Sequence, residues 1–547
     1  MAPAIPLVIS QSERVFPESR AYGERVVALS LLDATTADFA LTNALWLFEF
    51  EHPTTAPEGF NLTRHLQQSF STVLSAYPQW CGQCKSVTSL DGSTGEEAKG
   101  LPPHARRFGR VYAHYDCEDD PGVELITASS PATLETIYPV SRTETLPLWN
   151  CQDAGLNVFI PATAIASAMP FQPNDPDGNG LRKPLLAIQI TELACSGFVL
   201  AAKAAHPMAD TTGLVHLLKD WARVSRSMLL HEPATFQSAS VFDPDRVDKM
   251  AAGDINAEKP DESILSRARS LPMHHFDWWA PADGRPWPSN VPAIFEGQEL
   301  TPAGLRLPWA DWDVAASVLT YIIHLNRQQV DFLWKAATRD QPADVRISKH
   351  DAVLAHIWSC VMRARGLGND TNPVHCDLTL GLRPVLQLGN SFMGSPIILM
   401  NAEMTGAEVA REGGISLVAR CLRETIIKMS DKAGLAAHLH SVAFEKSPQR
   451  IWNAFLGRRH ILVTTWARSG IYELDFGFGS VIRYADGIVP NMDGCILIKE
   501  APPSCQKEAT SSGGKPAWTD NGVDITVPLR AEDMERLLQD PLLLPKW

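Results

Sequence analysis

Residues 232–314 divide this sequence into two halves, because they are rich in proline and acidic residues and show little hydrophobic periodicity. On either side, strand-like and helix-like segments alternate, which is typical of α/β folds. A loop this long inside a compact protein is usually a linker or a functional element. The chain of 547 residues is also longer than one ordinary core supports. We therefore predict two similar α/β domains, residues 1–231 and 315–547, joined by a crossover loop.

The composition is that of a folded globular protein, with 45% hydrophobic and 20% charged residues. The formal net charge of −14 argues against a nucleic-acid partner, because phosphate binding needs an excess of Lys and Arg. No stretch reaches the roughly 18 to 20 apolar residues that a membrane span requires. The N-terminus lacks the basic start of a signal peptide. We expect a soluble, cytoplasmic monomer with neither nucleic-acid nor membrane partners.

The ten cysteines are too sparse for a disulfide scaffold. Cys81 and Cys84 form a Cys-x-x-Cys pair that resembles the thioredoxin dithiol, but they follow a predicted helix at 62–76 instead of preceding one. A redox role is therefore disfavoured. Zinc is disfavoured as well, because no second pair of Cys or His at ligand spacing faces this one. We predict no metal site.

A candidate general base, His206, follows the β-hairpin that we predict over residues 185–205. A histidine with a pKa near 6.5 is largely neutral at pH 7, and burial would lower that pKa further. An isolated buried histidine is nevertheless more often structural than catalytic. A second His-x-x-x-Asp pattern, His216 and Asp220, falls on a predicted amphipathic helix, where we expect a surface ion pair.

The second half contains a series of helix and strand signals that lead to a glycine-rich motif. Ser348 is a predicted N-cap, with Asp351 in the first turn of the helix that follows. The remaining features are, in chain order, a strand that ends at Arg383, a turn at Gly394, a helix over 415–429, the strand I-L-V-T-T-W and the turn D-F-G-F-G at 475–479.

The segments A-A-H-P-M-A-D at 204–210 and D-F-G-F-G at 475–479, with T-T-W-A-R-S-G-I-Y-E-L before the second, resemble motifs of the BAHD family of acyl-CoA-dependent acyltransferases. The long insertions resemble those of its fungal secondary-metabolite members. The resemblance implies an α/β fold of two similar chloramphenicol-acetyltransferase-like domains, each a mixed β-sheet with flanking helices. It also implies an acyl-CoA co-substrate, a small-molecule acceptor with a hydroxyl or amine, and no permanently bound cofactor.

The same resemblance implies roles for individual residues. His206 takes the role of general base, and Thr464 lies near the tetrahedral oxyanion, to which a hydroxyl can donate a hydrogen bond. Asp210 is turned away from the substrate toward Arg383 and has a structural role. The remaining candidates are the structural turn residues Asp475, Gly477 and Gly479 and, for substrate binding, Trp466.

Two residues depart from the family pattern. Phe478 stands where a tryptophan is most common, and Thr211 stands where a glycine often follows the aspartate. Neither change removes a group that performs chemistry. Two other functions remain open: a base-promoted elimination or cyclisation of a metabolite without an acyl donor, and non-catalytic binding of a metabolite. The retention of His206 and its neighbours argues against the second of these.

The separation of the two motifs predicts a reaction centre between the halves, since His206 closes the first half and Thr464 belongs to the second. Ligand sites favour such interfaces. We expect a tunnel with His206 midway, and Lys or Arg side chains near one mouth for the phosphates of the donor. The tryptophans of the crossover are expected to pack this loop onto a domain, more than to line an acceptor pocket: Trp278, Trp279 and Trp287.

Overall fold

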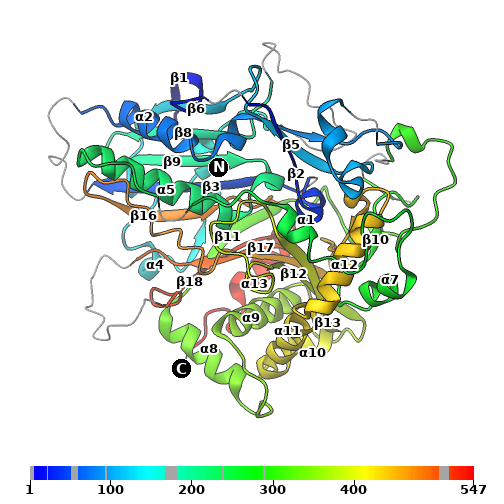
Figure 1. Cartoon of the computed structure of the whole chain (residues 1–547). Coiled ribbons are helices and arrows are strands. Elements are labelled where there is room, and N and C mark those ends of the chain that lie inside the picture. The colour runs from blue at the N-terminus through cyan, green and yellow to red at the C-terminus, as the bar shows by residue number, and fades with distance from the viewer. Residues whose placement is uncertain are drawn as a thin grey trace.

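The computed structural model contains two large β-sheets, one above the other, each covered by helices (Figure 1). This architecture confirms the predicted α/β class. No helix among the described residues is long and apolar enough to cross a membrane. The structure describes residues 5–20, 23–37, 39–50, 60–92, 95–166, 182–236, 239–281, 284–286, 291–503 and 517–546.

The first sheet has six strands, which are antiparallel to their neighbours except for the parallel pair β6 and β8. Two helices pack their apolar faces on this sheet, α2 (Leu62–Leu74) and α5 (Thr211–Leu229). The strand order is β1 (Val8–Val15), β6 (Val123–Ser130), β8 (Leu186–Leu193), β9 (Phe198–Ala204), β3 (Thr42–Phe50) and β16 (Ser480–Gly487).

The second sheet has seven strands, of which β12, β15 and β17 run parallel to one another. Its order is β13 (Ile397–Thr405), β12 (Pro373–Gly381), β15 (His460–Thr465), β17 (Cys495–Glu500), β18 (Val523–Arg530), β11 (Val318–Leu325) and β7 (Leu148–Asn150). The helices against it are α8 (Arg327–Thr338), α9 (Lys349–Ala364), α11 (Ile415–Met429) and α13 (Ala531–Gln539).

Smaller elements complete the fold. A three-stranded sheet consists of β2 (Arg25–Ala28), β5 (Val111–Tyr115) and β4 (Gln83–Ser86), and a two-stranded one of β10 (Phe276–Asp277) and β14 (Ile451–Trp452). The other α-helices are α1 (Leu31–Thr35), α3 (Leu134–Ile137), α4 (Arg142–Thr145), α6 (Asp245–Asp248), α7 (Glu262–Arg269), α10 (Gly406–Ala410) and α12 (Lys432–Phe444). The crossover residues 232–314 thus carry α6, α7 and β10 within their described part.

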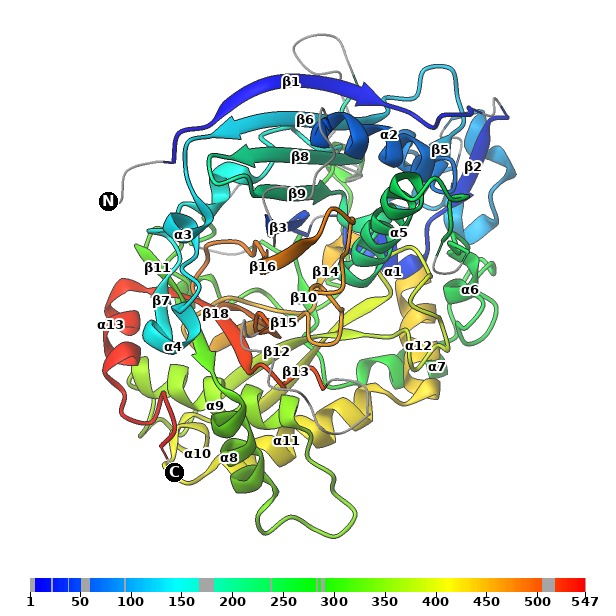
Figure 2. The same cartoon turned by 90° about the vertical axis from the view of Figure 1, so that its left-hand side faces the viewer.

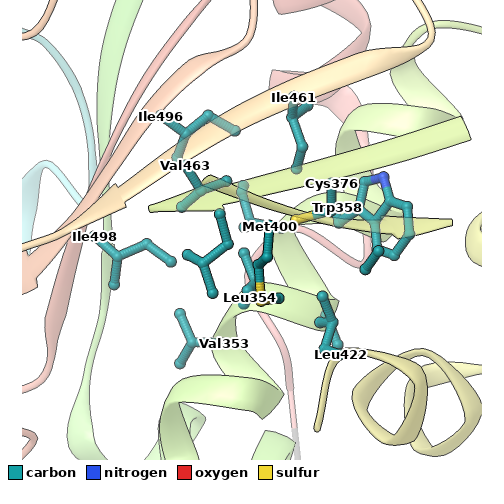
Figure 3. Close-up of a cluster of buried hydrophobic side chains, with 14 of the residues drawn as sticks. Val353, Leu354, Trp358, Cys376, Met400, Leu422, Ile461, Val463, Ile496 and Ile498 are labelled. Carbon is teal, nitrogen blue, oxygen red and sulfur yellow. The ribbon is translucent and has the colours of Figure 1, made fainter. Parts of the chain in front are cut away.

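The core of the second half lies between α9, α11 and the parallel strands (Figure 3). Helix α9 begins with the predicted capping box, in which Ser348 and Asp351 satisfy each other's backbone N–H groups. The side chains that fill this layer are apolar and almost fully buried, and they include Val353, Leu354, Trp358, Cys376, Met400, Leu422, Ile461, Val463, Ile496 and Ile498.

Each large sheet takes one edge strand from the other half of the sequence (Figure 2). Strand β16 comes from the C-terminal half and pairs with β3 in the first sheet. Strand β7 comes from the N-terminal half and pairs with β11 in the second sheet. The backbone hydrogen bonds of each sheet therefore depend on both halves of the chain.

The predictions of the hairpin and of the two cysteines, which rest on short sequence patterns, agree with the structure. The hairpin after residue 185 forms as β8 and β9, with Ser196 at a positive φ of 65° in the turn. Cys81 is buried, and burial raises the pKa of its thiol to about 12, opposite to the change that a redox dithiol needs. Cys84 is buried as well, and burial also raises its pKa.

One prediction about α5 is wrong. His216 and Asp220 are not on the surface, because both side chains are buried. Nε2 of His216 lies 3.6 Å from Oδ2 of Asp220, and the Tyr77 hydroxyl donates a hydrogen bond of 2.6 Å to Asp220. The pair therefore belongs to the helix packing of the first half.

A buried ionic network joins the exchanged strand β7 to the second sheet. Arg142, which precedes β7, donates to both carboxylate oxygens of Asp524 on β18 at 3.0 and 3.2 Å. Arg142 also donates to the Ile322 carbonyl oxygen on β11, and His324 lies 2.8 Å from the same carboxylate. Arg142 and Asp524 have no exposed side-chain surface. Removing one charge of such a buried pair leaves the other charge uncompensated, which strongly destabilises the folded protein.

Replacing Arg142 with methionine should lower the free energy of unfolding by about 3 to 5 kcal/mol, because it leaves the buried Asp524 carboxylate without its cation. Urea and thermal unfolding would measure this loss. Arg327→Met is the control, because Arg327 is 58% exposed and lies 3.7 Å from Asp520. An exposed pair of this kind contributes at most about 1 kcal/mol. Equal losses in the two variants would contradict the role given to the Arg142 network.

Candidate active site

A cavity of about 690 Å³ lies between the two large sheets. Its walls come from β3 and the start of α5 in the first half, and from β12, β13, β15 and β17 in the second half. The lining is mainly apolar and aromatic, with a few polar side chains, as is usual for small-molecule sites. Among the predicted site residues, His206, Asp210, Arg383, Thr464 and Trp466 line this cavity.

His206 stands in a single 3-10 turn, His206–Met208, directly after β9. Its ring meets the edge of the Phe39 ring at a centroid distance of 5.6 Å, and its Nδ1 lies 3.1 Å from the Ser395 hydroxyl. Ser395 donates its single hydroxyl hydrogen to the His206 carbonyl oxygen. The hydroxyl can therefore only accept from the ring, so Nδ1 carries the hydrogen and Nε2 keeps its lone pair.

The electrostatic surroundings keep the His206 ring neutral. Burial lowers the pKa of His206 below its ordinary value of 6.5, and the negative charge of Asp210 opposes this change without cancelling it. A neutral imidazole with a free Nε2 at the wall of an apolar cavity can accept a proton at neutral pH.

Asp210 holds the turn that carries His206. Its side chain caps α5 by accepting from the Gly213 backbone N–H at 3.0 Å. Its other oxygen accepts from Arg383, which follows β12, and the two charged side chains are 11% and 6% exposed. Arg383 also donates to the carbonyl oxygens of Phe392 and Gly394 at 3.0 and 3.2 Å. The Asp210 carboxylate thus connects the turn that carries His206 to the second half of the chain.

Two residues near His206 were not selected from the sequence as site residues, Ser395 and Asp33. The Ser395 backbone N–H donates to the Asp33 carboxylate, which also accepts from Ser30 at the start of α1. Burial is the main reason that the pKa of Asp33 rises to about 7. Gly394 has φ of 128°, and a Cβ there would lie 2.9 Å from Asp33. The turn at Gly394 was predicted from the sequence, but its contact with Asp33 was not.

Thr464 and Trp466 reach the cavity from the other sheet. Thr464 lies on β15, and the Trp466 backbone N–H continues the ladder by donating to Ile498 at 2.8 Å. The indole ring of Trp466 packs on the backbone of Gly487, where a Cβ would approach ring atoms to 2.5 Å. Trp466 is only 7% exposed, so its indole forms a fixed part of the cavity wall.

The D-F-G-F-G turn lies outside the cavity, against the C-terminal end of α5. Asp475 accepts from the Gly477 backbone N–H at 2.9 Å and forms an ion pair of 3.1 Å with Arg226 of α5. Gly477 and Gly479 have φ of 89° and 64°, and a Cβ on Gly477 would lie 2.6 Å from Leu229. The turn leads directly into the exchanged strand β16.

A connected series of aromatic rings extends from His206 along the cavity wall. Phe39 contacts the His206 ring, Trp452 contacts Phe39 at a centroid distance of 5.5 Å, and Trp278 contacts Trp452 at 5.6 Å. Trp278 therefore lines the cavity as well as packing the crossover, whereas Trp279 is buried away from the cavity among Phe108 and Phe295. Trp287 lies outside the described residues.

Comparison with known proteins assigns the chain to a family. Residues 150–542, more than half of the chain, match the family model described as Transferase family, so the chain belongs to this family, the BAHD acyltransferases. It is 23% identical over 547 residues to acyltransferase AFT15-1 of Alternaria alternata, covering 98% of this chain and 97% of that protein. It is also 23% identical to acyltransferase abl6 of Leptosphaeria maculans, covering 98% of both proteins.

The fold is shared with a solved fungal structure. F. graminearum TRI101 in complex with coenzyme A and deoxynivalenol has a TM-score of 0.62 and 18% identity, with 95% of this chain and 98% of that chain covered. The family and its named relatives identify the chain as an acyl-transferring enzyme.

Asp210→Asn should lower the free energy of unfolding by about 3 to 5 kcal/mol, because it leaves the buried Arg383 guanidinium without its anion. The enzymatic activity should fall as well. Thermal and urea unfolding, measured beside turnover, would test this outcome. Asp475→Asn is the control, since Asp475 and Arg226 are 56% and 51% exposed and their pair should contribute at most about 1 kcal/mol. An Asp210→Asn protein with unchanged stability and no activity would show that Asp210 acts in the chemistry itself.

Proposed function

We propose that this enzyme transfers an acyl group from an acyl-CoA thioester to a hydroxyl or amine of a specialised metabolite, with His206 as general base and Thr464 as hydrogen-bond donor to the oxyanion. The observation that carries this proposal is the single cavity of about 690 Å³ that both residues line from different sheets. A bimolecular acyl transfer needs a base and an oxyanion donor that act on one reacting centre.

The residues support a sequence of proton and electron movements that balances. Nε2 of His206 takes the proton of the acceptor while the acceptor oxygen or nitrogen attacks the thioester carbonyl carbon. The carbonyl electron pair moves to the oxygen, to which the Thr464 hydroxyl donates a hydrogen bond. When the tetrahedral intermediate collapses, the carbonyl re-forms and the carbon–sulfur bond breaks. The leaving thiolate then receives the proton from His206, giving the acylated acceptor and free CoA.

Ser395 fixes the base in the form that this step needs. Its hydroxyl accepts from Nδ1 and donates to the His206 carbonyl oxygen, so the ring tautomer and its direction are held together. As His206 becomes positively charged, the Asp210 carboxylate favours the charged ring through its Coulomb interaction. Asp210 therefore supports the proton transfer by its field and by holding the turn, without contacting the acceptor.

The acceptor would lie along the aromatic wall, and the donor would enter past Arg468. Phe39, Trp452 and Trp278 offer flat apolar surfaces beside His206, which suit an apolar or aromatic acceptor more than a highly charged one. Arg468 lines the cavity and is exposed, so its guanidinium is available to the phosphates of CoA. TRI101, which shares the fold, was solved with coenzyme A bound.

His206→Ala should lower kcat by a factor of about 10² to 10⁴ while the protein remains folded, because the variant lacks the base. The measurement is release of free CoA from a panel of acyl-CoA thioesters in the presence of candidate acceptors. His231→Ala is the matched control, since His231 is exposed and outside the cavity. Near-normal turnover in His206→Ala would show that another group is the base. Conversion of an acceptor without CoA release would favour elimination or cyclisation.

The pH dependence of kcat/KM should show an acid limb below pH 6.5. The pKa of His206 is lowered from its ordinary value of 6.5 by burial, and only the neutral ring can accept a proton. Activity should therefore persist as the pH falls to 6.5 and decline only at lower pH, when the ring becomes protonated. Initial rates at low substrate concentration across this range would measure the limb. A limb above pH 6.5 would exclude His206 in this environment as the titrating group.

A further inference from the structure

Three histidines from distant segments meet beneath the aromatic wall of the cavity. His274 lies in the crossover just before β10, His375 lies on β12, and His460 begins β15. One ring nitrogen of each lies within 4.8 Å of the others. The side chains of these residues are 11%, 14% and 4% exposed, so the cluster is largely closed to solvent.

A fully buried carboxylate lies against this cluster. Asp377 places one oxygen 3.2 Å from Nε2 of His274 and the other 3.4 Å from Nδ1 of His460. The second oxygen also accepts from the Phe455 backbone N–H at 3.0 Å. No residue of the cluster lines the acyl-transfer cavity, and Phe455, whose ring lies 5.3 Å from that of His460, stands between them.

Two buried atoms of the cluster lie close together. Nε2 of His274 and Oδ1 of Asp377 are 3.2 Å apart and buried, so the Asp377 carboxylate faces the ring of His274 directly. The separation matches that of neighbouring ligands in a tetrahedral zinc site, which lie about 3.3 Å apart when the bonds are about 2.0 to 2.1 Å long.

The other two imidazoles have one nitrogen occupied and one free. Nδ1 of His375 lies 3.2 Å from the Asn401 side-chain oxygen, and Nδ1 of His460 faces Asp377. Both neighbours are acceptors, so Nδ1 carries the hydrogen in each ring and Nε2 keeps its lone pair. Histidines that ligate metals commonly donate their second ring N–H to a carboxylate or carbonyl oxygen in this way.

We propose that His274, His375 and His460, with Asp377 as their anionic partner, form a binding site for one divalent transition-metal ion of the zinc type. Imidazole ligands favour zinc, copper, nickel and cobalt over magnesium and calcium. The rings of His375 and His460 are stacked at a centroid distance of 4.3 Å, so one ring turns on binding to direct its free nitrogen to the ion. The site is separate from the acyl-transfer residues.

The site would fasten the crossover to the second sheet. His274 is four residues before Trp278, which forms part of the cavity wall, and β10 between them pairs with β14. A metal bound to His274 and to two neighbouring parallel strands would fix this part of the crossover. Its role is thus structural, and it stabilises the folded chain through binding.

A second group in the described residues, Glu24, His114 and Cys117, is a weaker metal candidate. The Lys85 ammonium lies 2.8 Å from Nδ1 of His114, and a positive charge there opposes binding of a second cation. This group supplies the control for the experiment.

The test is metal binding by the full-length protein after removal of metals with a chelator. Zn²⁺ titration by calorimetry should give saturable one-to-one binding, Zn²⁺ should raise the thermal midpoint, and Co²⁺ should give the visible absorption of a tetrahedral site. His375→Gln should weaken Zn²⁺ binding at least tenfold, whereas His114→Ala should leave it unchanged.

Failure of the unaltered protein to bind Zn²⁺ or Co²⁺ saturably would overturn the proposal, independently of how any variant folds. Retained binding in His375→Gln with loss in His114→Ala would assign the ion to the other group and would also overturn it. Circular dichroism of both variants distinguishes loss of the site from loss of the fold.

Discussion

The ion pair between Asp210 and Arg383 is the contact on which the geometry of the candidate active site depends. It joins the first residue before α5 to the segment after β12, and therefore joins the two halves of the chain at the point where His206 stands. The same carboxylate caps a helix, and the same guanidinium binds two carbonyl oxygens of the 392–394 turn. A displacement of either partner would move the base, its Ser395 contact and one wall of the cavity together.

The cavity combines an apolar lining with a few fixed polar groups, and this combination has electrostatic consequences. Because the wall excludes much of the water, a hydrogen bond from Thr464 to a developing oxyanion would be stronger there than in solution. The same lining opposes a charged His206 in the resting enzyme. The nearby Asp210 charge partly offsets this opposition once the ring takes up a proton, so the base need not change position during the reaction.

The sequence could predict those parts of the structure that depend on local patterns. The β8–β9 hairpin follows from alternating apolar residues, and the start of α9 follows from the Ser348 and Asp351 capping box. The motif resemblance selected His206, Thr464 and Arg383, all of which line one cavity. The prediction of a surface pair at His216 failed because a polar i,i+4 pair has the same sequence pattern whether the pair is exposed to water or buried in the fold.

What the sequence could not predict depends on contacts between distant segments. Ser395 meets Asp33 across 362 positions of the chain, and no spacing rule links the two residues. The exchange of β7 and β16 between the sheets leaves no local pattern, since an edge strand has the same alternation in either sheet. The cluster around Asp377 likewise draws its histidines from a loop and two strands that are not consecutive in the sequence.

The exchange of strands also determines when the molecule can complete its folding during synthesis. Strand β3 is among the first elements to leave the ribosome, but its partner β16 ends at residue 487. Until then, one edge of the nine-residue β3, with its apolar neighbours, has no strand to pair with. Unpaired edges of this kind favour association between nascent chains. The first half is therefore synthesised early, but its sheet is completed only after β16 has been made. Slow translation of the C-terminal half would prolong the interval in which the enzyme can aggregate.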